Sequence, residues 1–167
     1  MKTTTVERGK DAGPVSMISL PPDARALSTV SRVDYEDAFL VDVGVDRTAE
    51  QWLRAVINDP PFAVRARLVT GWLTLGLKLG LPWSGRRVLG WKVLHSDASY
   101  VLLGAESWLG LRGQLLFRSE TGGALLFATI VQLSNPAARA VWATITPTHQ
   151  DVVHSLLSHA AGREACR

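Results

Sequence analysis

The chain has 167 residues, which is the size of one domain, and 47% of them are apolar while 20% are charged. This composition is ordinary for a globular protein with a single core. The net charge of +3 comes from dispersed basic residues and not from a dense Lys/Arg block. The charge pattern therefore argues against a nucleic-acid partner.

The ends of the chain indicate its compartment. The single cysteine, Cys166, precludes an intramolecular disulfide, and no Cys/His spacing typical of a zinc site is present. The N-terminal residues lack the apolar core of a secretory signal, so we expect a cytoplasmic protein. The most membrane-like stretch, 68–81, contains Lys78 and is shorter than the ~20 apolar residues that a spanning helix needs. We therefore expect no transmembrane segment.

The chain before residue 33 shows no sustained hydrophobic period. Three prolines and scattered charges interrupt it. We expect a flexible tail over 1–32, with a short segment around 15–20 laid on the body. A single domain should follow over 33–163, with a disordered end over 164–167.

The first regular elements are a strand and a capped helix. Apolar residues recur at every second position from Phe39 to Val45, which predicts a half-buried strand. Thr48 and Gln51 have the spacing of a capping box, so a helix should begin at Thr48. Its apolar positions share one stripe, which consists of Ala49, Trp52, Leu53, Val56 and Ile57.

A second helix is expected over 61–79. The proline pair at 60 and 61 ends the first helix, and Pro61 can begin the next without losing a hydrogen bond. Its apolar stripe consists of Leu68, Trp72, Leu75 and Leu79. Glycines within it cost about 1 kcal/mol each relative to alanine, and they indicate either close packing or a pliable lid.

The rest of the chain predicts a strand meander followed by a long helix. Strand-like runs cover 88–94, 100–105, 109–118 and 124–133, with short turns between them. Asn135 and Pro136 then begin a helix that extends to about Gly162. Pro147 predicts a kink or break in this helix, because its ring clashes with the preceding turn.

This order of elements predicts an α+β fold. Its curved antiparallel sheet should have about five strands, with two helices after the first strand and a long C-terminal helix broken near Pro147. Several short segments carry a likeness to a known arrangement: Asp37-Ala38-Phe39, Trp52-Leu53, Val88-Leu89-Gly90-Trp91, Leu103-Gly104-Ala105, 109–112, Pro147-Thr148-His149, Val152-Val153 and Leu156-Leu157.

With these segments the chain resembles the helix-grip proteins of the START and Bet v 1-like (SRPBCC) superfamily over about residues 34–161. Within that superfamily it is similar to uncharacterised bacterial single-domain proteins, a domain of unknown function that also occurs fused to short-chain-dehydrogenase-like proteins. The resemblance implies a fold and a cavity, and no catalytic role or cofactor.

The chain departs from that family pattern at two places. The family would have an acidic pair and a histidine soon after Leu103-Gly104, where this chain has Glu106 and no histidine. It would have Pro-Phe-His where this chain has Pro147-Thr148-His149. An activity that depended on that polar cluster would be altered here.

Glu106, Arg112 and His149 are the ionisable candidates for a site, because each lies within or beside apolar sequence. Glu106 and His149 are the candidate catalytic residues, and Glu106, Arg112 and His149 could bind a polar ligand group. The alternative is structural: Glu106 and Arg112 form a cross-strand ion pair, and His149 caps the helix after Pro147. The five-residue spacing of the histidines rotates each by roughly 140° around a helix, which predicts no metal site.

Tryptophans are the other candidates for lining a ligand pocket, although such residues are more often part of the core. Those assigned to the pocket are Trp72, Trp91, Trp108 and Trp142.

Three functions stay open. The first is binding of a hydrophobic or amphipathic small molecule between the sheet and the C-terminal helix, without a cofactor. The second is a cofactor-independent cyclase, dehydratase or isomerase acting on a polyketide-like or isoprenoid-like substrate. The third is homodimerisation or peripheral membrane attachment through the Leu-rich helix at 61–79. No dinucleotide-binding, P-loop or nucleophile-elbow motif is present.

Overall fold

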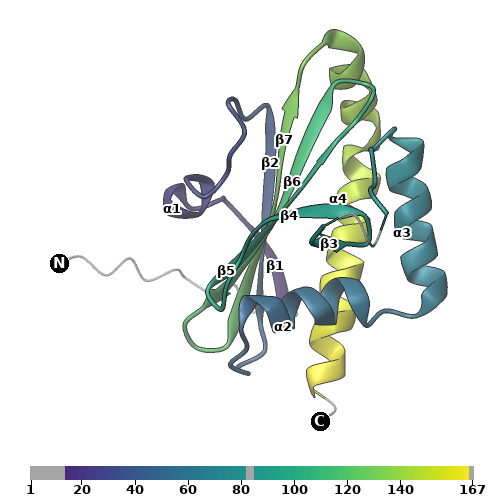
Figure 1. The fold of residues 1–167 in the computed structure, drawn as a ribbon. Coiled ribbons are helices and arrows are strands. Elements are labelled where there is room, and N and C mark those ends of the chain that lie inside the picture. Colours follow the sequence, from purple (N-terminus) through teal and green to yellow (C-terminus); the bar gives the residue numbers. More distant parts are fainter. Residues whose placement is uncertain (1–13, 82–84, 166–167) are drawn as a thin grey trace.

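Figure 1 shows the computed structural model, which describes residues 14–81 and 85–165. Within these residues seven strands form one antiparallel sheet, in the order β1-β2-β7-β6-β5-β4-β3. The strands are β1 (Val15–Ile18), β2 (Tyr35–Asp42), β3 (Arg87–Val88), β4 (Trp91–Ser96), β5 (Tyr100–Glu106), β6 (Leu111–Glu120) and β7 (Ala124–Leu133). The sheet is strongly twisted.

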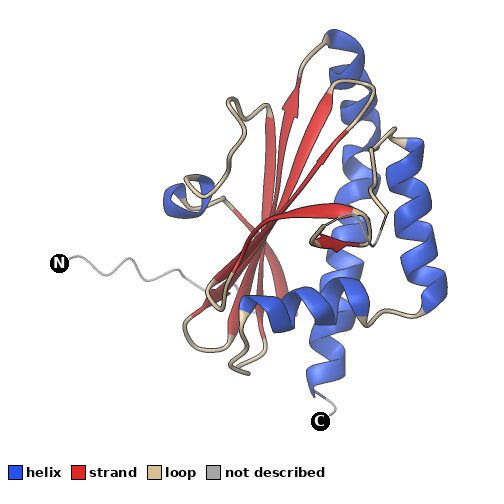
Figure 2. Ribbon diagram, in the orientation of Figure 1, coloured by secondary structure: helices blue, strands red, loops and turns tan. Residues whose placement is uncertain are grey.

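Helices cover both faces of this sheet unequally. The helical elements are α1 (Pro22–Arg25), α2 (Ala49–Leu53), the π-helix η1 (Arg54–Asn58), α3 (Phe62–Thr74) and α4 (Pro136–Ala165). Figure 2 shows α2, α3 and α4 on one side of the sheet and the short α1 on the other. We call the side with α4 the helix face and the side with α1 the back face. None of the helices in the described ranges is long and apolar enough to cross a bilayer.

Alternation along the strands gives each face its own core. The larger core lies on the helix face and includes Phe39, Val41, Trp52, Leu115, Phe117, Phe127 and Leu157. The smaller core lies on the back face and includes Leu20, Ala24, Ala38, Leu102, Leu116, Leu126 and Ile130. The central strands are therefore buried on both sides, which explains the nearly continuous apolar sequence of β7.

The segment before residue 33 is part of the folded body as far as the structure describes it. Val15–Ile18 pair with β2 as an edge strand, and Leu20 and Ala24 pack on the back face. Residues 14–32 therefore differ from the expected flexible tail, although the docked segment expected around 15–20 is present. The earlier part of that tail, 1–13, lies outside the described residues.

The helix expected at Thr48 is confirmed together with its cap. The Thr48 hydroxyl accepts a hydrogen bond from Gln51 N–H at 3.2 Å, and Gln51 Oε1 accepts one from Thr48 N–H at 2.9 Å. All five predicted stripe residues are buried. Helix α2 continues directly into the π-helix η1, which ends before Pro60.

The second helix is shorter than predicted, because α3 ends at Thr74 and not near residue 79. Gly76 adopts a φ of +68°, which turns the chain toward the β5–β6 connection. There Leu77 forms a bridge with Ser107, and Lys78 N–H donates to Glu106 O at 2.7 Å. Pairing with the sheet edge thus replaces the last helical turn.

The sheet has more strands than the expected five for two reasons. β1 belongs to the segment that was expected to be a tail. The run 88–94 is divided by a tight turn, in which Leu89 and Gly90 both have positive φ values, of 45° and 91°. This geometry is that of a two-residue hairpin, so β3 and β4 are separate antiparallel strands.

The break expected near Pro147 is wrong, because α4 is helical on both sides of this proline. A proline inside a helix removes the hydrogen bond to the carbonyl four residues earlier, here that of Ala143. Pro147 and Ala143 are both exposed, so water can bond that carbonyl. The helix continues and packs along the sheet.

Candidate functional site

A carboxylate and a histidine meet on the helix face between the sheet and α4. Asp37, the third residue of β2, is only 6% exposed. His149 projects from α4 and places Nε2 3.2 Å from Asp37 Oδ2. A buried ion-pairing carboxylate is unusual in a core that is otherwise apolar, and it marks this point of the fold as a candidate site.

Strand register brings a threonine to the same point. Asp37 and Thr129 are direct cross-strand partners in β2 and β7, so their side chains emerge together on the helix face. His149 Nε2 lies 3.1 Å from Thr129 Oγ1. Three elements that are distant in sequence therefore converge on one imidazole nitrogen.

Tyr35 extends the hydrogen-bond network along β2. Its hydroxyl donates to Asp37 Oδ2 at 2.6 Å and accepts from Gln150 Nε2 at 3.0 Å. The Trp142 ring packs edge-on against Tyr35, with ring centroids 5.2 Å apart, and lies 5.3 Å from the His149 ring. These contacts fix the orientation of His149.

Burial and hydrogen bonding shift the pKa of Asp37 in opposite directions. Burial by itself raises the pKa of this carboxyl, but the hydrogen bond and electrostatic attraction of His149, with the hydrogen bond from Tyr35, outweigh it. The pKa of Asp37 is therefore below its ordinary value. Burial and the adjacent carboxylate raise the pKa of the Tyr35 hydroxyl, so Tyr35 remains a donor at neutral pH.

This arrangement determines which atoms of the pair are available to a ligand. An ionised carboxylate only accepts hydrogen bonds, so the contact with Asp37 requires a proton on His149 Nε2. In the neutral ring Nδ1 is then an acceptor, and no residue in the described ranges bonds to it. Asp37 Oδ1 is likewise buried without a hydrogen-bond partner among those residues. With a neutral imidazole, the site therefore presents two acceptors without donors, whereas in the imidazolium Nδ1 is a donor.

His149 also forms part of the wall of a small apolar cavity between the sheet, η1, α3 and α4. Its volume is about 50 Å³. The lining comprises Val56, Ile57, Leu68, Trp72, Leu115, Phe127, His149, Val152, Val153, Leu156 and Leu157. The cavity thus combines an oily interior with one polar residue.

The structure brings some of the predicted site residues together here. Trp72 and His149 both line the cavity. Trp91 packs behind Trp72, with centroids 5.5 Å apart, and Trp142 packs on His149. Trp91 and Trp142 are buried core residues that support the cavity wall without lining it.

The other predicted residues lie elsewhere. Glu106 and Arg112 are cross-strand partners joined by an ion pair of 2.8 Å, and both side chains are about half exposed. Their strand positions place them on the back face, in phase with Leu102 and Leu116 of the smaller core. The structure therefore does not bring Glu106 to His149.

Trp108 is also separate from the cavity. It lies in the β5–β6 turn, is 80% exposed, and has the Lys78 ammonium 4.0 Å from its ring centroid.

Sequence reasoning missed Asp37, Tyr35 and Thr129 as members of the site. A signal was present, because Tyr35 and Asp37 are polar residues in the same alternation as the buried Phe39 and Val41. Thr129 is likewise a polar residue within the apolar run of β7. The described residues contain no group of three or more His, Cys, Asp or Glu side chains that could hold a metal ion.

Comparison with models of protein families gives no match for this sequence, and comparison with curated proteins gives no significant match. The fold is α+β, with a seven-stranded antiparallel sheet and a long C-terminal helix packed on it. This arrangement is compatible with the helix-grip architecture.

Proposed function

We propose that the protein binds a hydrophobic small molecule carrying a hydroxyl group, between the helix face of the sheet, α3 and α4. The observation that carries this proposal is His149, which lines an apolar cavity and is paired with the buried Asp37. Apolar pockets with a few convergent polar groups are the usual form of a small-molecule site. The helix-grip resemblance supports the same location, and we propose membership of that superfamily with it.

The polarity of the pair favours a neutral ligand with a donor. In the neutral ring His149 Nδ1 is an acceptor without a described partner, so the hydroxyl of a ligand in the cavity can donate to it. A ligand carboxylate would bring a second negative charge close to Asp37, which is unfavourable in a buried site. The site should therefore prefer an alcohol or phenol to an acid of the same size.

Ligand entry requires the cavity to expand, because 50 Å³ is far below the roughly 300–1,000 Å³ of small-molecule sites. α3 is the element that can move. Among its residues only Leu68 is fully buried, while Phe62 and Leu73 are exposed and no side chain caps its N-terminus. Outward displacement of α3 would uncover Leu68 and Trp72 and enlarge the space beside His149.

Three fluorescent or absorbing bicyclic probes test this proposal. 2-Naphthol, naphthalene and 2-naphthoate share one apolar body and differ in the polar group. We expect saturable binding in the order naphthol, naphthalene, naphthoate. His149→Phe should remove the preference for naphthol over naphthalene while it leaves naphthalene binding in place.

A cavity-blocking variant provides the matched control. Leu156 lines the cavity, whereas Leu73 is an exposed residue of α3. Leu156→Phe should weaken naphthol binding at least about tenfold by filling the space, and Leu73→Phe should not. Failure of all three probes to bind, or tightest binding of naphthoate, would contradict the proposal.

Proton transfer is a second candidate function, because an imidazole oriented by a buried carboxylate is also a general base. His149 would accept a proton at Nδ1 while Asp37 stabilises the imidazolium. This candidate function keeps His149 as the residue that moves the proton and assigns no role to Glu106, which lies on the back face.

The base-sensitive probe 5-nitrobenzisoxazole, whose ring opens on loss of one proton, tests this candidate. Wild-type protein should accelerate its opening at least about tenfold over His149→Phe, and Glu106→Gln should match wild type. Equal rates for wild type and His149→Phe would exclude a general base here.

A further inference from the structure

A basic hollow lies on the back face, at the edge formed by β3, β4, β5 and β6. Its volume is about 450 Å³, within the range of small-molecule sites. Its charged lining residues are Lys78, Arg87, Lys92, Arg112 and Glu106. Four cations thus face one carboxylate, whereas the molecule as a whole carries only +3.

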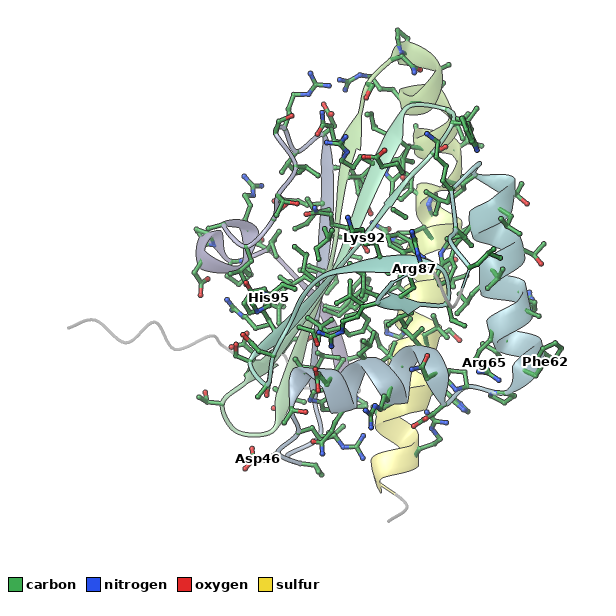
Figure 3. All side chains as sticks on the ribbon, in the orientation of Figure 1. Asp46, Phe62, Arg65, Arg87, Lys92 and His95 are labelled. Atoms are coloured by element: carbon green, nitrogen blue, oxygen red, sulfur yellow. The ribbon has the colours of Figure 1, made fainter. Side chains whose placement is uncertain are left out.

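Strand register explains why these cations gather. Arg87 pairs with Lys92, Lys92 with Gly104, and Gly104 with Gln114, so these four positions form one row across the sheet. Figure 3 labels Arg87 and Lys92 on the adjacent strands β3 and β4. Gly104 has no side chain, and Leu94, which also lines the hollow, covers this position, since a Cβ on Gly104 would lie 2.7 Å from Leu94 Cδ1. The strand register therefore brings Arg87 and Lys92 together on the back face, beside the loop residues Thr29 and Lys78 that complete the lining.

Gln114 provides a fixed wall opposite the basic end of the row. It is 2% exposed. Its Oε1 accepts from the Ser28 hydroxyl at 2.7 Å and from Thr29 N–H at 3.1 Å. The segment with Ser28 and Thr29 thereby forms one side of the hollow and holds the Gln114 side chain in place.

The cations differ in how they are engaged. Arg112 is paired with Glu106, and Lys78 lies over the Trp108 ring. Arg87 Nη1 donates to Gly90 O at 3.1 Å. Lys92 is exposed and has no ion pair with any residue of the described ranges. Lys92 and the outer side of the Arg112 guanidinium are therefore the groups that can engage an anion directly.

We propose that this hollow binds an oxyanion group, specifically a phosphate. Guanidinium and ammonium groups converging on one space suit a multiply charged oxyanion, which they bind through charge-assisted hydrogen bonds. The phosphate belongs either to a soluble compound or to a lipid headgroup. The exposed Trp108 ring beside Lys78 suits the lipid source, because tryptophan favours the membrane interface.

This site is independent of the proposed cavity. The sheet separates the hollow on the back face from His149 on the helix face. Loss of probe binding in His149→Phe would therefore leave the oxyanion site intact, and the two proposals can fail separately.

Two arms of one experiment distinguish the sources of phosphate. Inorganic pyrophosphate is titrated into the full chain by calorimetry. In parallel, the protein is sedimented with phosphatidylcholine vesicles that contain or lack 20% phosphatidylglycerol by composition, on the order of a cytoplasmic leaflet's anionic content. In whichever arm shows binding, Lys92→Glu should weaken that binding by about tenfold or more. Arg112→Gln provides a second variant at a different strand.

Arg67→Glu is the matched control, because Arg67 is an exposed cation of α3 that does not line the hollow. Pyrophosphate binding lost in Lys92→Glu but kept in Arg67→Glu supports the site with a soluble ligand. Binding to anionic vesicles alone, with the same pattern of variants, supports it with a lipid headgroup. No binding in either arm, or equal weakening by Arg67→Glu and Lys92→Glu, overturns the proposal.

Discussion

At the scale of single residues, Asp37 is the group whose environment has the clearest energetic consequence. Its carboxylate is buried, hydrogen-bonded to Tyr35 and paired with His149. Its pKa is lowered in the folded protein, so folding favours the ionised form. The stability it contributes is complete above the unfolded pKa, about 3.9, and is lost as the pH falls through the lowered folded pKa.

We therefore predict that Asp37→Asn reduces the free energy of unfolding at neutral pH by about 1–3 kcal/mol. The difference from wild type should shrink as the pH falls below about 4, because the unfolded wild-type chain then binds a proton at Asp37 that the folded state binds only at lower pH. Urea unfolding at pH values from about 2.5 to about 7, on both sides of the unfolded-state pKa, measures both effects.

Asp151→Asn is the control for this series, since Asp151 is exposed on α4 and no described residue pairs with it. It should reproduce the wild-type curve. A constant difference between wild type and Asp37→Asn at all pH values would show that the charge of Asp37 does not contribute.

Single residues also show which part of the candidate site could not be predicted from the sequence. His149 was identifiable because an ionisable group stands within an apolar helix pattern. Its partner Asp37 was not, because the pairing depends on the β2–β7 register and on where α4 crosses the sheet. Glu106 and Arg112 were correctly recognised as possible cross-strand partners, and the structure pairs them in that way.

At the scale of elements, the sequence correctly predicted those helices and strands whose local pattern agrees with their packing in the fold. The capping box and the apolar run of β7 predicted their elements well, because each is determined by nearby residues. The end of α3 and the β3–β4 turn were missed, since sheet-edge pairing ends the helix and a positive φ at Leu89 is unusual for leucine.

The β6–β7 hairpin provides a prediction at this scale. Gly122 and Gly123 both have positive φ, of 81° and 78°. A Cβ on Gly123 would lie within 3 Å of backbone atoms of Gly44 and Val45, whereas one on Gly122 meets nothing within 4 Å. Gly122→Ala should therefore cost about 1 kcal/mol through backbone strain alone.

Gly123→Ala adds a clash that only backbone movement can relieve, and should cost about 3 kcal/mol. Thermal and urea unfolding of the two variants measure the difference. Equal stabilities would mean that the 44–45 segment does not pack on the hairpin as the structure places it.

Helix α3 gives a second prediction for an element, because the proposed site opens by its displacement. Its amides should exchange with deuterium faster than those of residues 153–161 in α4, because only Leu68 is buried in α3 whereas Val153, Leu157, Ala160 and Ala161 are buried in that part of α4. Addition of 2-naphthol should slow exchange in α3. Exchange in α3 that is as slow as in α4 and insensitive to the probe would argue against this helix as the entrance.

At the scale of the whole molecule, the sheet separates two surfaces of different chemistry. The helix face presents an oily cavity with an oriented imidazole, and the back face presents a hollow rich in cations. The general α+β arrangement with a long C-terminal helix was predictable from element order. The back-face hollow was not, because it depends on a seven-strand register and on the docking of residues 18–33.

The central claim is that an apolar ligand enters beneath α3 and α4 and reaches His149. Isotope-filtered nuclear Overhauser spectra of the protein with 2-naphthol locate the ligand directly. The account predicts cross-peaks from the naphthol ring to the methyl groups of Leu68, Val153 and Leu156, which line the cavity. Cross-peaks confined to exposed residues such as Leu73 and Leu109, or none at all, would contradict it.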